Sequence, residues 1–172
     1  MSGPMEAAFY VAAVVAVVST LLAITRLVAV HALLYLIVSF LAVAVVFYTM
    51  GAPLVATLEV IIYAGAILVL FLFVVMMLNV GTRDREQERQ WLSGAAWLGP
   101  AILSTILLAE VIFLIVSGAT SNTTGAIAAN IGPREVALAL YGPYMIGVEL
   151  ASMLLLGAVV GATHLSKQEA RP

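Results

Sequence analysis

One segment constrains this chain more than any other: residues 58–78, which read LEVIIYAGAILVLFLFVVMML. The apolar length exceeds the roughly 20 residues that a helix needs to cross a bilayer, yet the segment contains an acid, Glu59. A charged side chain costs about 2.5–3.5 kcal/mol at the bilayer centre on insertion scales. Tyr63 lies one turn further on, and Gly65 weakens a helix by about 1 kcal/mol relative to alanine. A buried acid beside a weak turn indicates a functional helix rather than a passive anchor.

The composition predicts an integral membrane protein. Of the 172 residues, 64% are hydrophobic and 9% are charged, whereas soluble domains carry about 25% charged residues. The apolar runs are continuous rather than alternating, so they predict helices and not the strands of a membrane barrel. The chain has no cysteine, which excludes disulfides and thiolate-held iron–sulfur clusters. The two histidines lie far apart in the sequence, and no metal site is expected.

The expected fold is an all-α integral membrane protein with five transmembrane helices in a single membrane domain, residues 1–172. The helices are expected at approximately 7–25, 32–50, 54–78, 97–117 and 141–163. The third, at a rise of 1.5 Å per residue, is about 37 Å long and must tilt, overshoot or depart locally from α geometry. Its glycine is compatible with a π-bulge, although close helix packing is the commoner role of such a residue. Residues 118–140, rich in Ser, Thr, Gly and Asn, predict a mobile loop.

The basic residues predict the orientation of the chain. With the N-terminus outside, most of them fall on the cytoplasmic side: Arg26, Arg83, Arg85, Arg89, Lys167 and Arg171. Only Arg134 falls outside. Because cytoplasmic loops of membrane proteins are enriched in Lys and Arg, we expect a periplasmic N-terminus, a periplasmic loop at 118–140 and a cytoplasmic C-terminus.

Three acids lie within the expected helices: Glu59, Glu110 and Glu149. No Lys or Arg lies within the core of any span. Each acid is therefore either protonated, exposed to a hydrated crevice or paired with a polar group of another chain. A proton relay is the functional interpretation, and a neutral acid that hydrogen-bonds between helices is the alternative. The first is favoured for Glu59 and the second for Glu110, while both remain open for Glu149.

Residues 57–79 resemble the third helix of the J subunits of bacterial respiratory complex I, the proton-pumping NADH:quinone oxidoreductase. The resemblance extends to HALLYLIVS at 31–39, EQERQWL at 86–92, WLGPAIL at 97–103 and YGPYMIGVELASMLLL at 141–156. It covers nearly the whole chain and implies a multi-pass subunit of the bacterial inner membrane with five helices.

The resemblance also implies the biochemical role. Such a subunit would be a non-catalytic membrane component that helps couple electron transfer from NADH to quinone to proton translocation. It would bind no cofactor itself, since FMN, the iron–sulfur clusters, NADH and quinone belong to other subunits. Its expected partners are the lipid bilayer and the other membrane subunits of the hetero-oligomer, A, K, H, N and their neighbours. No nucleic acid partner is expected, because the chain has no basic stripe.

In this family the third helix has a π-bulge that can convert to regular α-helix, a change proposed to open or close a hydrated path near the quinone cavity. Carried over to this sequence, the resemblance implies four proton-path or gating residues: Glu59, Tyr63, Gly65 and Glu149. Glu110 matches no motif of the family. The resemblance implies no catalytic, cofactor-binding or metal-binding residue in this chain.

Two alternatives remain at this point. One is a related subunit of a cation/proton antiporter complex or a membrane-bound hydrogenase, against which the segments at 86–92 and 141–156 favour complex I. The other is a purely structural spacer that holds neighbouring helices apart.

Overall fold

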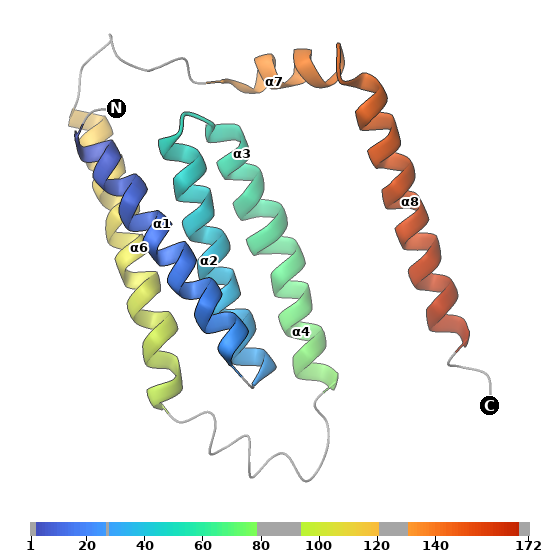
Figure 1. Ribbon diagram of the computed structural model, residues 1–172, viewed down its shortest axis with the longest axis horizontal. Coiled ribbons are helices and arrows are strands. Elements are labelled where there is room, and N and C mark those ends of the chain that lie inside the picture. Colours follow the sequence, from blue (N-terminus) through green and yellow to red (C-terminus); the bar gives the residue numbers. More distant parts are fainter. Residues whose placement is uncertain (1–2, 27, 79–93, 121–130, 169–172) are drawn as a thin grey trace. The chain divides into compact units, whose positions relative to one another are not determined.

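The computed structural model describes residues 3–26, 28–78, 94–120 and 131–168, and all of its regular structure in these ranges is helical (Figure 1). The chain divides into two units, Met1–Asn130 and Ile131–Pro172. We describe each unit by itself. The expected charged loop between the third and fourth helices, residues 79–93, lies outside the described residues.

The first unit contains four spans. They are α1 (Gly3–Thr25), α2 (Ala29–Thr49), a continuous third span made of α3 (Pro53–Leu58), the π-helix η1 (Glu59–Ile67) and α4 (Leu68–Leu78), and finally α6 (Gly94–Thr120). The second unit contains α7 (Pro133–Leu140) and α8 (Met145–Gln168). Within the described residues, five helices are long and apolar enough to cross a membrane, which confirms the expectation of an all-α protein with five membrane-length helices.

The structure differs from the expected loop at residues 118–140. The helix α6 continues to Thr120, and Pro133–Leu140 forms the short helix α7. Gly132 precedes this helix, a proline opens it, and Glu135 lies in its first turn, where a negative charge is favourable. Residues 121–130 of the predicted mobile loop lie outside the described part of the chain. The last span begins at Met145, a few residues later than expected.

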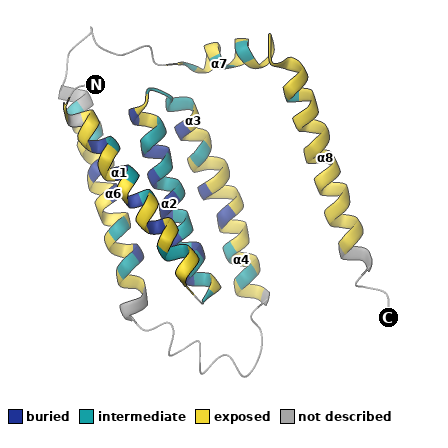
Figure 2. Ribbon diagram, in the orientation of Figure 1, coloured by how far each residue is buried: buried dark blue, intermediate teal, exposed yellow. Residues whose placement is uncertain are grey.

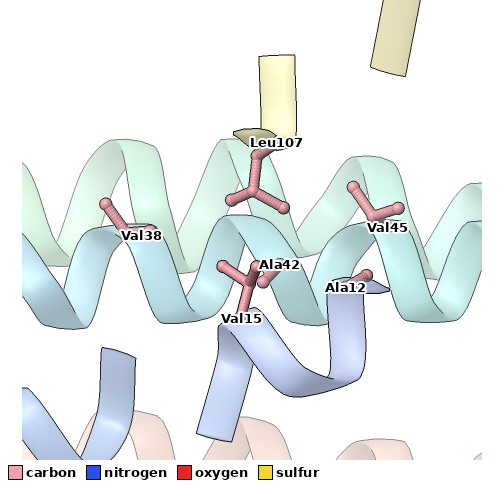
Figure 3. Packing of buried hydrophobic residues seen from close by; sticks show 6 residues of the cluster. All are labelled: Ala12, Val15, Val38, Ala42, Val45 and Leu107. Carbon is pink, nitrogen blue, oxygen red and sulfur yellow. The ribbon is translucent and has the colours of Figure 1, made fainter. Parts of the chain in front are cut away.

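Helix α2 is the central element of the first unit. It contacts α1, α6 and every segment of the third span, and it has the largest buried share of the five spans (Figures 1 and 2). Its packing surface is made of small and β-branched side chains that meet α1 and α6 (Figure 3). The cluster consists of Ala12, Val15, Val38, Ala42, Val45 and Leu107. Because Ala12 and Ala42 are fully buried and short, the backbones of α1 and α2 approach closely.

A small polar group joins α1 to α2 inside this apolar packing. The Ser39 hydroxyl donates to the Ala16 carbonyl oxygen at 3.1 Å, and its oxygen lies 2.7 Å from the Thr20 hydroxyl. Thr20 also donates to the Ala16 carbonyl, at 2.8 Å. Interhelical hydrogen bonds of this kind contribute on average about 0.6 kcal/mol in a membrane protein. They fix the register of α2 against α1.

A second contact joins α2 to α6. Tyr35 is 3% exposed, and its hydroxyl accepts a hydrogen bond from the Arg26 guanidinium at 3.5 Å. The guanidinium carbon also lies 5.2 Å from the centre of the Tyr35 ring, within the range of a cation–π interaction. On the other side the hydroxyl faces Gly99 so closely that a Cβ atom at this position would overlap it. Gly99 therefore makes room for the tyrosine.

Gly99→Ala is expected to destabilise the protein, because the new methyl group would displace the Tyr35 hydroxyl. Overpacking of this kind costs about 1–3 kcal/mol. The measurement is the thermal unfolding of the membrane protein that carries the variant. The matched control is the double variant Gly99→Ala/Tyr35→Phe, which removes the opposing hydroxyl and should recover much of the loss. A Gly99→Ala protein as heat-stable as the wild type would contradict the close contact of Gly99 with Tyr35.

Candidate functional site

The third span changes its winding in the middle. Over the nine residues Glu59–Ile67 the backbone is a π-helix, flanked by the α-helical turns of α3 and α4. At its end, the Leu68 N–H donates to the Tyr63 carbonyl oxygen, five residues earlier. A π turn holds more residues than an α turn, and short π segments inside α-helices occur frequently at functional sites. The winding therefore singles out this segment as the candidate site.

The N-terminal end of the span is tied to α2. Gly51 has φ of 83°, a left-handed conformation that glycine adopts without strain, and Pro53 opens α3 immediately afterwards. The Ala52 N–H donates to the Phe47 carbonyl oxygen at 3.0 Å, which closes the turn. This short connection leaves little freedom at the start of the third span.

Gly65 fits the π winding because it has no side chain. A Cβ atom at this position would lie 2.9 Å from the Val60 carbonyl oxygen. That separation is shorter than real Cβ atoms accept, and the opposing atom belongs to the backbone, so a substitution would require the helix itself to shift. A glycine at position 65 is thus a local requirement of the observed winding.

The acid and the tyrosine lie in the same π segment. Glu59 is its first residue and is partly exposed, and among the described residues its carboxyl group has no hydrogen-bond or ion-pair partner. Tyr63 is 48% exposed, and its ring stacks on Phe40 of α2 with the ring centres 5.6 Å apart. Three of the predicted site residues, Glu59, Tyr63 and Gly65, therefore lie together on η1, with the Tyr63 ring against α2 and Glu59 partly exposed.

The other two acids lie elsewhere. Glu110 in α6 is only 8% exposed and approaches the Ala12 backbone of α1, but neither carboxyl oxygen forms a hydrogen bond within the described chain. Glu149 belongs to the second unit, where it is an exposed residue of α8. The described residues include no group of three or more His, Cys, Asp or Glu that could hold a metal ion.

An apolar cavity of about 490 Å³ adjoins the start of the π segment. Its lining comes from α2, the third span and α6, and includes Tyr48, Thr57, Val60 and Leu107. In addition, the third span has the smallest buried share of the spans in the first unit (Figure 2). The chain's own packing therefore restrains this span less than it restrains α1 or α2.

Phe40 is a contact of the site that the sequence did not predict. It is one apolar residue in a long apolar helix, and only the arrangement of the two helices shows that its ring lies on Tyr63. The sequence contains no signal that distinguishes it from the neighbouring apolar residues.

Together, the five apolar spans and the acid-bearing π segment define a multi-pass membrane protein with a polar site built into one helix. Residues 19–165 match the model of a family described as NADH-ubiquinone/plastoquinone oxidoreductase chain 6. The chain belongs to this family. It is a multi-pass protein of the inner membrane.

Individual relatives agree with the family match. The chain is 52% identical over 167 residues to NADH-quinone oxidoreductase subunit J of Pseudomonas aeruginosa, which covers 97% of this chain and 99% of that protein. It is 50% identical over 165 residues to the subunit of the same name from Escherichia coli strain K12, with 96% of this chain and 88% of that protein covered. It is 37% identical to NADH-quinone oxidoreductase subunit J of Rhodobacter capsulatus, with 92% of this chain and 80% of that protein covered. The resemblance to the J subunits is confirmed.

Gly65→Ala is expected to destabilise the π winding relative to regular α-helix, because its methyl group would meet the Val60 carbonyl oxygen. A steric conflict of about 1–3 kcal/mol would be large enough to reverse the preference of a two-state segment. The measurement is the backbone density of residues 59–67 in cryo-electron microscopy of the assembled complex. Val69→Ile, which adds one carbon at a 53% exposed position of the same span, is the control. A π segment unchanged by Gly65→Ala would refute the steric argument.

Proposed function

We propose that this subunit J of NADH-quinone oxidoreductase helps couple electron transfer from NADH to quinone to proton translocation, by gating a hydrated path near the quinone cavity through its third span. The observation that carries the proposal is the π-helix at Glu59–Ile67, which coincides with the acid, the tyrosine and the glycine of the segment. FMN, the iron–sulfur clusters, NADH and the quinone are bound by other subunits, and this chain contributes no catalytic residue.

The gate is a change of winding. A backbone that loses the extra residue of a π turn rotates the residues that follow, because each residue of an α-helix occupies about 100° of turn. Gly51–Pro53 tie the start of the span to α2, so the rotation is transmitted downstream, into α4. Because the span is little buried within its own chain, few packing contacts of the chain oppose such a rotation.

A modest driving force is sufficient. Moving a two-state equilibrium from 1:99 to 99:1 requires about 5.5 kcal/mol of differential interaction, and smaller shifts require less. Quinone chemistry in a neighbouring subunit can supply this energy if one redox state of the quinone favours the π winding over the α winding. The chain then acts as a switch between two discrete backbones rather than as a flexible tether.

The polar groups of η1 supply the proton path when it is open. The Glu59 carboxyl group exchanges protons with water or with an acid of a neighbouring subunit, and the Tyr63 hydroxyl extends the hydrogen-bonded chain by one turn. Glu149, on α8 of the second unit, is a further proton-path candidate. Glu110 lies against the backbone of α1 inside the chain's own packing, and it is assigned a structural role.

The subunit sits among the membrane subunits A, K, H and N of the hetero-oligomer, with its N-terminus in the periplasm and its C-terminus in the cytoplasm. The basic residues support this orientation, since Arg26, Lys167 and Arg171 fall on the cytoplasmic side together with the arginines of 83–89, while Arg134 falls outside.

The relation to cation/proton antiporters or hydrogenases becomes the weaker alternative, because subunit J of Pseudomonas aeruginosa matches 97% of the chain.

Gly65→Val and Tyr63→Phe test the gate against a purely structural spacer. The first blocks the π winding and the second removes only a hydroxyl group, so both should lower the number of protons translocated per NADH oxidised while the complex still assembles. A decrease of about tenfold in coupled turnover corresponds to an increase of about 1.4 kcal/mol in the activation free energy. The measurement is proton uptake by vesicles that contain the purified complex. Leu70→Ile, at an exposed site of α4, is the control. Wild-type pumping in an assembled Gly65→Val complex would favour the spacer.

Glu59→Gln tests the acid separately. The amide cannot transfer the proton, but acids of neighbouring subunits offer parallel routes, so the activity should fall without being abolished. We expect coupled quinone reduction to decrease by about three- to tenfold, a barrier increase of roughly 0.7–1.4 kcal/mol. The measurement compares NADH oxidation by an artificial acceptor, which should stay unchanged, with quinone-dependent proton pumping. Unchanged pumping would remove Glu59 from the path.

A further inference from the structure

Phe40 of α2 makes a contact that the acids and the glycine of the third span do not explain. Its ring stacks on Tyr63 with the ring centres 5.6 Å apart and an angle of 29° between the planes. These values lie in the range of an offset-stacked aromatic pair, in which the centres are about 4.5–7 Å apart. Of the aromatic ring pairs in the described chain, the other joins the neighbours Phe9 and Tyr10, so the Phe40 pair is the one that connects two helices.

The Phe40 backbone is held in place by the packing of α2 on α1. The preceding residue, Ser39, donates to the Ala16 carbonyl oxygen at 3.1 Å, and Ala42, two residues further on, is fully buried. Tyr63, in contrast, lies on the least buried span of the first unit and is 48% exposed. The stack therefore joins a fixed ring to a ring on the segment with the unusual winding.

The alignment of the two rings depends on the winding of η1. The start of the third span is fixed to α2 by Gly51–Pro53, and each residue of an α-helix occupies about 100° of turn. If a π turn upstream of Tyr63 became an α turn, the tyrosine would rotate about the helix axis and its ring would leave Phe40. The stack is consequently a feature of the π-wound state and not of the α-wound state.

We propose that Phe40 is a positioning residue that holds Tyr63 in the π-wound state and so sets how often the third span leaves it. This role rests on the proposed gating function, which it deepens by naming what stabilises one of the two states. Aromatic pairs of this geometry shift an equilibrium by about two- to twelvefold beyond the effect of area burial. Phe40 touches no reacting group, and it acts through Tyr63.

The test is cryo-electron microscopy of the assembled oxidoreductase, with the particles sorted by the winding of residues 59–67. Phe40→Leu keeps an apolar side chain but removes the ring, and it should lower the ratio of π-wound to α-wound particles by about two- to twelvefold. Phe40→Tyr keeps the ring and should leave the ratio unchanged. Phe71→Leu makes the same substitution on α4, at a 58% exposed residue with no ring pair in the described chain, and serves as the matched control.

An unchanged ratio in the assembled Phe40→Leu complex would overturn the proposal, including the case in which every particle of both proteins is π-wound. If Phe40→Leu does not assemble, Phe40→Met, which has an unbranched and adaptable side chain, is judged by the same criterion. A decrease equal to that of Phe71→Leu would also overturn the proposal, because it would show a general effect of losing an aromatic ring.

Particle ratios and proton pumping, measured on the same variants, separate this proposal from the gating function. Tyr63→Phe keeps the stacked ring but loses the hydroxyl, so its particle ratio should match the wild type while its pumping falls. If Phe40→Leu shifts the ratio but the protons pumped per NADH stay at the wild-type value, Phe40 positions Tyr63 and the gate is wrong. If the ratio does not move while Gly65→Val uncouples the complex, the gate stands and the role of Phe40 is wrong.

Discussion

In hydrocarbon, every backbone N–H and C=O group must find its partner inside its own helix, because no water is available and an unpaired group costs several kcal/mol. A membrane span therefore has few ways to change shape. Replacing bonds between residues four apart with bonds between residues five apart is one of them, since the groups stay paired while the residues that follow rotate. The segment Glu59–Ile67 has this alternative pairing, and the proposed gating depends on it.

The rest of the first unit provides a fixed reference for that segment. Helix α2 packs on α1 through alanines and valines, and Ser39 and Thr20 add hydrogen bonds across the interface. Tyr35 connects the same helix to Arg26 and, through the space left by Gly99, to α6. The third span meets only one side of this assembly and adjoins an apolar cavity of about 490 Å³. The closely packed pair α1 and α2 beside a less buried third span is a suitable arrangement for a part that moves against a frame.

The five spans and the unusual length of the third could be predicted, because span length and the absence of charge follow directly from bilayer thickness. Gly65 and Glu59 could be singled out because each costs free energy in its position. The glycine weakens the helix, and the acid lies in an apolar span. The packing partners could not be predicted. Lipid and protein interior are equally apolar, so the pattern of apolar residues does not reveal which face of a span is buried. Phe40, the Tyr35–Gly99 contact and the burial of Glu110 against α1 became visible only in three dimensions. Helix α7 was missed because its proline start lies within a stretch rich in turn-forming residues.

The most direct measurement compares the backbone of residues 59–67 in the oxidoreductase at rest with the same backbone during steady turnover with NADH and quinone, by cryo-electron microscopy of one preparation. The account predicts two populations, one π-wound and one α-helical, whose proportions change when turnover begins and return when the substrate is exhausted. A single winding with constant proportions in resting and working enzyme, at a resolution that shows the carbonyl groups, would contradict the claim that this helix is the gate.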